Sequence, residues 1–161
     1  MPRLLIVDDQ PDVIDYFVDA LKARHFDVDV IPDVVAAIDY LNSPPGDLVA
    51  IILDIIMPPG PFADKEHQGG LRTGKFLHEH ILNMEYVQED YGHRFPIAVL
   101  TQVSDQGVLK EMEEIQIAMW RKAGKNPKPT WFQVWSKYEV EPKYFAIEFE
   151  EWLKVMEELS K

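Results

Sequence analysis

The stretch "LLIVDDQPD", residues 4–12, decides how the chain is interpreted. Four apolar residues run directly into Asp8 and Asp9, and a polar residue and a proline follow. The apolar run is typical of a buried strand, and the proline suits the first turn of a helix. Two adjacent carboxylates repel each other and are tolerated best beside a positive charge. The junction between strand and helix therefore predicts a site that attracts a cation.

The rest of the chain alternates apolar runs with helical stripes. The expected strands cover 4–7, 28–31, 48–56, 95–101 and 130–136, and the expected helices cover 10–25, 33–41, 71–82, 105–124 and 144–161. Strands that alternate with helices indicate an α/β fold with a parallel sheet and right-handed crossovers. The pattern predicts one domain over residues 1–161, with a doubly wound, five-stranded parallel sheet and flanking helices.

Composition excludes several classes of function. The formal net charge of −12 disfavours non-specific binding to nucleic acid, and no run of lysine and arginine forms a basic patch. The absence of cysteine excludes disulfides, thiolate metal sites and a thiol nucleophile. The start of the chain is too short and acidic for a signal peptide, and no apolar run is long enough to span a membrane. The expected location is the cytoplasm.

Polar residues follow four of the expected strands. Asp8 and Asp9 follow the first, Asp54 lies near the end of the third, Thr101 ends the fourth and Lys137 follows the fifth. The carboxyl ends of parallel strands share one edge of a sheet, so these side chains are expected to converge there. Three carboxylates favour a hard cation with oxygen ligands, and Mg²⁺ is the expected one. A carboxylate beside Mg²⁺, a lysine and a hydroxyl makes a phosphoryl-transfer site, in which the carboxylate can be the nucleophile.

These motifs resemble the receiver domains of two-component response regulators. The resemblance rests on "LLIVDD", "IILDIIMP", "AVLT" and "WSK", in the expected order, and it covers essentially the whole chain. It implies the flavodoxin-like receiver fold, in which Asp54 is the phosphoacceptor, Thr101 is the switch hydroxyl and Lys137 pairs with the phosphoryl group. It also implies that Mg²⁺ binds to Asp9, to Asp54, to the backbone carbonyl of Ile56 and, largely through water, to Asp8.

The implied function is a stand-alone receiver rather than an enzyme. Phosphoryl transfer to Asp54 would come from a histidine kinase, a phosphotransfer protein or a small phosphodonor, followed by slow autodephosphorylation. Phosphorylation would then change binding to a downstream protein through the face formed by 105–124, 130–136 and 144–161, with a homodimer as a further arrangement. Neither nucleic acid nor a membrane is an expected partner.

The sequence departs from the receiver pattern at several positions. Tyr138 follows the lysine where receivers usually have a proline in a cis turn, and Gln102 stands where a small residue is usual. Val134 occupies the position of the switch aromatic, and Trp135 comes one residue later, so its side chain is expected on the other face of the sheet. Ile56 is apolar at a position that influences dephosphorylation in receivers.

The chain also carries insertions near 59–70, 83–95 and 120–130. The 59–70 loop is interpreted either as a lid or partner contact or as a solvated insertion, because long surface loops are tolerated. The four tryptophans, all within the last 42 residues, indicate either aromatic anchors for a partner or a thicker core.

Two motifs are interpreted without a functional role. "GGLRTGK", residues 69–75, nearly fits a phosphate-binding loop, but Phe76 replaces the hydroxyl that would bind Mg²⁺ and no strand precedes it. The histidines of "HEH", residues 78–80, point to different faces of a helix, so both are expected on the surface rather than at a metal.

Two alternative functions remain open. One is a degenerate receiver that acts as a phosphorylation-independent interaction module. The other is a Mg²⁺-dependent phosphohydrolase with an aspartate nucleophile, which ranks low because Ile56 occupies the place of the second acid that such enzymes require.

Overall fold

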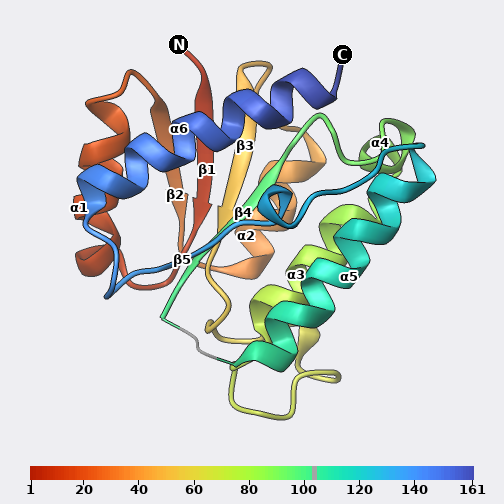
Figure 1. Ribbon diagram of the computed structural model, residues 1–161. Coiled ribbons are helices and arrows are strands. Elements are labelled where there is room, and N and C mark those ends of the chain that lie inside the picture. Colours follow the sequence, from red (N-terminus) through yellow and green to blue (C-terminus); the bar gives the residue numbers. More distant parts are fainter. Residues whose placement is uncertain (103–104) are drawn as a thin grey trace.

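The computed structural model describes residues 1–102 and 105–161, and its centre is one parallel sheet. The five strands are ordered β2-β1-β3-β4-β5 (Figure 1). Their bounds are β1 Arg3–Val7, β2 Asp27–Ile31, β3 Leu48–Leu53, β4 Ile97–Thr101 and β5 Val134–Ser136. Every neighbouring pair is parallel, so all the strands end at the same edge of the sheet.

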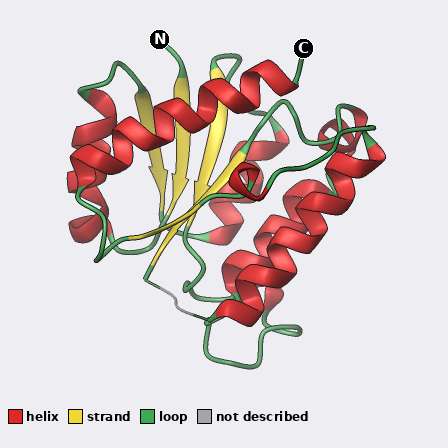
Figure 2. Cartoon of the chain, in the orientation of Figure 1, coloured by secondary structure: helices red, strands yellow, loops and turns green. Residues whose placement is uncertain are grey.

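Helices cover both faces of this sheet (Figure 2). The α-helices are α1 Pro11–Lys22, α2 Val34–Asn42, α3 Thr73–Leu82, α4 Glu85–Glu89, α5 Gln106–Lys122 and α6 Pro142–Leu159, with 3-10 turns η1 Gly60–Phe62 and η2 Pro129–Trp131. α1 and α6 pack on one face, α2 and α3 pack on the other, and α5 lies beside α3. The expected doubly wound α/β fold is confirmed.

Alternation along the strands creates the two halves of the core. In β1, Leu4 and Ile6 contact the residues of α1 and α6, whereas Leu5 and Val7 contact those of α2 and α3. Both sets are fully buried, as a parallel sheet covered on two faces requires. Burial of these side chains is the main stabilising contribution to the fold.

Two expected strand boundaries are wrong by more than two residues. The run 48–56 forms a strand only to Leu53, because the chain leaves the sheet at Asp54 to make the loop before α3. The run 130–136 contributes a strand only from Val134, since its first part belongs to the turn η2. Strong apolar and β-branched composition continues past both strand boundaries, which explains the overestimate.

The connection 83–95 is more ordered than a simple loop and contains the short helix α4. Tyr86 donates a hydrogen bond from its hydroxyl to the backbone carbonyl of Leu41 at 2.5 Å, and its ring meets that of Phe95 edge to face. Phe95 is fully buried. This insertion therefore extends the α2–α3 layer of the core.

All four tryptophans lie in the core, which supports the second of the two interpretations given for them. Trp120 and Trp131 meet edge to face where α5 approaches η2. Trp135 packs against Phe145 and Phe149 of α6 and donates to Glu148 at 2.7 Å. Its indole therefore lies on the α1–α6 face, as expected from its register.

Among the described residues, no helix is long and apolar enough to span a membrane.

His78 corrects the expectation that both histidines of 78–80 lie on the surface. Its side chain is fully buried between α3 and α5, where Nε2 lies 3.0 Å from Oε1 of Gln116. His80 is half-buried against the ring of Phe62. The apolar stripe of α3 is broken at His78, so the sequence pattern gave no indication that this residue faces another helix.

Burial of His78 predicts a pH dependence of stability. Desolvation lowers the pKa of its imidazole from the ordinary 6.5 to about 4. Below pH 6.5 the unfolded chain binds a proton that the folded protein does not, so stability is lost as pH falls towards 4. At 1.36 kcal/mol for each pKa unit, the loss reaches about 3 kcal/mol. We expect His78→Gln to remove this component in urea unfolding between pH 7 and 4.

His67→Gln, a change of an exposed loop histidine, provides the matched control and is expected to keep the wild-type pH profile. An unchanged profile in His78→Gln would contradict the assignment of this pH dependence to His78.

Candidate phosphoacceptor site

Four of the residues predicted from the sequence meet at the carboxyl edge of the sheet. Oδ2 of Asp54 lies 2.8 Å from Nζ of Lys137, and Oδ1 of Asp54 accepts a 2.7 Å hydrogen bond from the hydroxyl of Thr101. Oδ2 of Asp8 lies 2.5 Å from the same ammonium group. All four side chains are buried, with Asp54 only 2% exposed. The parallel order β1-β3-β4-β5 brings together residues that are far apart in sequence.

Electrostatics explains why the lysine is essential to this arrangement. Burial raises the pKa of Asp8, and repulsion from Asp54 adds to the effect, while contact with Lys137 offsets part of it. Burial would by itself lower the pKa of Lys137, but the attraction of Asp54 and Asp8 outweighs it, so the pKa is raised. The ammonium group therefore remains charged and binds the two carboxylates together.

Asp9 completes an all-oxygen cluster with Asp8 and Asp54. One carboxylate oxygen from each residue lies within 4.8 Å of the other two, and Asp9 is the most exposed of the three. A set of carboxylates without histidine or cysteine suits a hard cation such as Mg²⁺. The residues present therefore fit the metal that the sequence predicts.

Asp8 and Asp9 do not cap the helix that follows them. The N-cap residue of α1 is Gln10, which makes no side-chain capping bond. Its backbone N–H instead donates to Oδ1 of Asp8 at 2.8 Å, which fixes that carboxylate at the end of β1.

The loop after Asp54 is held against the start of α3. The backbone N–H of Ile55 donates to Oδ1 of Asp54 at 2.7 Å, and the carbonyl of Ile55 accepts from the N–H of Gly74 at 2.8 Å. The hydroxyl of Thr73 donates to the carbonyl of Met57 at 2.6 Å. Ile56 lies between these contacts, and no described residue donates a hydrogen bond to its carbonyl, the expected metal ligand.

Gly74 allows this close approach, which gives a testable prediction. A Cβ atom at this position would lie 2.2 Å from the carbonyl oxygen of Asp54 and 2.5 Å from Cα of Ile55. Both are backbone atoms of a buried loop, so one side must move. We expect Gly74→Ala to lower the free energy of unfolding by about 3 kcal/mol in urea, the upper range for overpacking. Alanine has a higher helix propensity than glycine, so propensity by itself would raise the free energy of unfolding.

Gly46→Ala is the matched control, since a Cβ there meets nothing within 4 Å. It should change stability by less than about 0.5 kcal/mol. A Gly74→Ala protein as stable as wild type would show that helix and loop separate readily.

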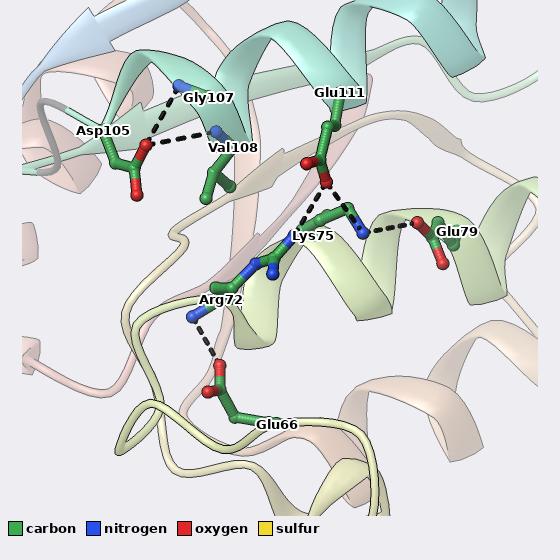
Figure 3. A network of polar contacts seen from close by, with 8 residues as sticks. All are labelled: Glu66, Arg72, Lys75, Glu79, Asp105, Gly107, Val108 and Glu111. Atoms are coloured by element: carbon green, nitrogen blue, oxygen red, sulfur yellow. Dashed lines mark hydrogen bonds and ion pairs between the residues drawn. The ribbon is translucent and has the colours of Figure 1, made fainter.

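Gly74 and Gly70 account for two of the three glycines in the run that resembles a phosphate-binding loop. Both glycines pack closely against the loop that follows Asp54, residues 55–57, which we call the acceptor loop, because a Cβ on Gly70 would lie 2.4 Å from the carbonyl oxygen of Met57. Lys75 instead pairs with Glu79 and Glu111 at 3.0 Å each (Figure 3). The contacts of Gly70, Thr73 and Gly74 were not predicted, although the unusual spacing of the glycines marked the segment.

The departures from the receiver pattern have clear places in the structure. The peptide bond between Lys137 and Tyr138 is trans, and the side chain of Tyr138 is exposed.

Gln102 is exposed and lines a groove between α5 and β5, together with Leu109, Lys110, Phe132 and Val134. Val134 is half-buried, so the face that carries the switch aromatic in receivers carries a small aliphatic side chain here.

Known structures share this fold, although sequence comparison finds no relative. No protein-family model and no curated protein matches the chain. The chain is similar in structure to a response regulator receiver domain protein (CheY-like) from Methanospirillum hungatei JF-1, with 15% identity, a TM-score of 0.63 and 98% of each chain covered.

Two further structures match at similar levels. A sensor protein from Polaromonas sp. JS666 has 17% identity and a TM-score of 0.63, with 96% of this chain and 98% of that chain covered. The response regulator protein TrrA from Thermotoga maritima, in complex with Mg²⁺-BeF, has 18% identity and a TM-score of 0.58, with 97% and 99% covered. The chain thus has the fold of response regulator receiver domains.

Proposed function

We propose that this protein is a receiver that accepts a phosphoryl group on Asp54 and transmits the change through protein–protein contact. The observation that supports this most strongly is the pair of contacts on one buried carboxylate, Thr101 at 2.7 Å and Lys137 at 2.8 Å. A hydroxyl and an ammonium group beside a carboxylate nucleophile are what phosphoryl transfer needs, because its transition state spreads negative charge over the phosphoryl oxygens.

The transfer follows from these positions. A carboxylate oxygen of Asp54 attacks the phosphorus of the donor, an O–P bond forms, and the donor leaves with the electron pair of its own bond to phosphorus. Lys137 and Thr101, which bond Asp54 in the unmodified protein, then bond the new phosphoryl oxygens. The phosphoryl group on Asp54 thereby binds residues at the ends of both β4 and β5.

Mg²⁺ is the cofactor that this donor set fits. Asp8, Asp9, Asp54 and the carbonyl of Ile56 would hold it, and it would neutralise charge on the phosphoryl group. Without a cation, the three acids are balanced locally by Lys137 alone among the described contacts of the site.

The donor of this proposal is a histidine kinase, a phosphotransfer protein or a small phosphodonor. The partner surface is the face of α5, β5 and α6, and a homodimer would use the same face. A groove of about 850 Å³ between α5 and β5 supports this choice, because Gln102, the residue after Thr101, is one of the residues that line it. A movement of Thr101 upon phosphorylation would therefore reach the groove directly.

Intact mass spectrometry after incubation with acetyl phosphate tests the proposal. With Mg²⁺ we expect a gain of about 80 Da, one phosphoryl group, and without Mg²⁺ we expect none. Beryllofluoride provides a second arm, because it should bind only with Mg²⁺ and change tryptophan fluorescence through Trp135, which precedes Ser136 and Lys137. A protein that gains no mass and binds no beryllofluoride would contradict the proposal.

The second candidate function is an interaction module that is never phosphorylated. The near-complete burial of Asp54 favours it, because both carboxylate oxygens already have protein partners in the unmodified state. The phosphohydrolase ranks lower, since the half-buried, apolar Ile56 occupies the position of its second acid. Turnover of a generic phosphate ester in the presence of Mg²⁺ would revive it.

A further inference from the structure

The inserted loop between Asp54 and α3 folds around one buried acid, Glu66. Its side chain is only 6% exposed, although its neighbours in the sequence, Lys65 and His67, are exposed. One carboxylate oxygen accepts from the backbone N–H of Gln68 and the other accepts from the backbone N–H of Arg72, both at 2.5 Å. Figure 3 shows the carboxylate of Glu66 facing the amide of Arg72. The carboxylate of Glu66 therefore holds the two ends of the turn 68–72 together.

This turn is bonded to the acceptor loop. The carbonyl of Gly70, in the middle of the turn, accepts a hydrogen bond from the N–H of Met57 at 3.1 Å. A trans peptide is planar and directs its C=O and N–H groups to opposite sides. Fixing the N–H of Met57 therefore also fixes the direction of the carbonyl of Ile56, which belongs to the same peptide group.

The turn is also anchored on its outer side. The guanidinium group of Arg72 pairs with Glu111 of α5 at 2.7 Å, and Glu111 also contacts Lys75 (Figure 3). These ion pairs are partly exposed, so each contributes little to stability. The hydrogen bonds to Glu66 are the stronger restraint, because they are buried and are not weakened by solvent as the exposed ion pairs are.

We propose that Glu66 is a positioning residue for the metal site, which acts through the turn 68–72 and Met57 to hold the carbonyl of Ile56 in place. This inference rests on the proposed function, because Ile56 is a ligand only if the site binds Mg²⁺. Groups that orient metal ligands change metal affinity by about 10- to 100-fold when they are altered. The insertion 59–70 is then part of the site's support rather than a lid over it.

Glu66→Gln tests the role of the carboxylate with a minimal change of shape. The amide nitrogen of glutamine cannot accept from a backbone N–H, so one of the two donors at Gln68 and Arg72 loses its acceptor. We expect the dissociation constant for Mg²⁺, measured by calorimetry, to rise about 10-fold. We also expect the amide protons of Met57 and Arg72 to exchange faster by NMR in metal-free buffer.

Asp64→Asn is the matched control, since it removes the same charge from an exposed position in the same loop. It should leave Mg²⁺ affinity within twofold of wild type and the exchange of Met57 unchanged. Thr73→Val removes the hydroxyl that donates to Met57 and should also weaken Mg²⁺ binding, while Thr73→Ser should retain it. These two variants test whether the loop after Asp54 must be held in place for Mg²⁺ to bind. If Glu66→Gln fails to fold, the test of Glu66 is the exchange of the amide protons of Gln68, Arg72 and Met57 in the wild-type protein, which should all be slow.

Wild-type affinity and wild-type exchange at Met57 in Glu66→Gln would overturn the positioning role, as would an equal loss of affinity in Asp64→Asn. Failure of the proposed function gives a different result. Wild-type protein would then bind no Mg²⁺, and exchange at Met57 would still report whether Glu66 holds the acceptor loop.

Discussion

Asp54→Asn is expected to abolish the phosphoryl adduct completely. The amide oxygen of asparagine is a poor nucleophile towards phosphorus, so the Mg²⁺-dependent gain of about 80 Da from acetyl phosphate should disappear from the intact mass. The variant should remain folded, because Lys137 keeps its ion pair with Asp8 and Thr101 keeps an oxygen as its acceptor. Circular dichroism and the midpoint of urea unfolding would verify this.

Asp39→Asn makes the same chemical change at an exposed position on α2 and should gain the adduct as wild type does. An adduct that persists in Asp54→Asn would place the phosphoryl group on another residue and refute the assignment of the acceptor. Peptide mapping of the modified wild-type protein would then identify the true site.

Lys137→Met is expected to destabilise the metal-free protein by roughly 3–5 kcal/mol at pH 7, as in other proteins that lose one partner of a buried ion pair. Without the ammonium group, Asp8 and Asp54 remain buried and repel each other. Methionine replaces the aliphatic part of the lysine, so the loss of packing is small. Urea unfolding in the presence of a metal chelator measures the difference.

The pH dependence of this effect has a definite sign. Asp8 already has a raised pKa because of its burial and the charge of Asp54, and loss of Lys137 raises that pKa further. A carboxyl whose folded pKa is raised stabilises the fold at low pH and loses that contribution as pH rises through the folded value. The deficit of Lys137→Met should therefore be smaller at pH 5 than at pH 7, and Mg²⁺ should restore part of it.

Lys128→Met, at an exposed position before η2, is the control and should be close to wild type at both pH values. A deficit in Lys137→Met below about 1 kcal/mol at pH 7 would show that the two acids are not ionised together in the folded protein.

The sequence by itself determined that the strands form a parallel sheet and which polar residues lie at its carboxyl edge. Apolar runs buried on both faces need helices on both sides, and parallel strands end at one edge. Asp8, Asp54, Thr101 and Lys137 were therefore predictable as neighbours, and the structure places them within hydrogen-bonding or ion-pair distance. Their roles in phosphoryl transfer and the role of Asp9 remain proposals.

Only the tertiary structure decided which polar residues are buried away from that edge. His78 and Glu66 occur in segments whose composition is typical of exposed helix and loop, yet both are enclosed. His78 is buried because α5 packs against α3 at that position, and Glu66 because the insertion folds back on backbone amides of its own turn. Such partners are chosen by packing between distant segments and by loop closure, and neither leaves a periodic signal in the chain. The burial of the four tryptophans was also decided by packing, because a side chain is buried only where other elements cover it.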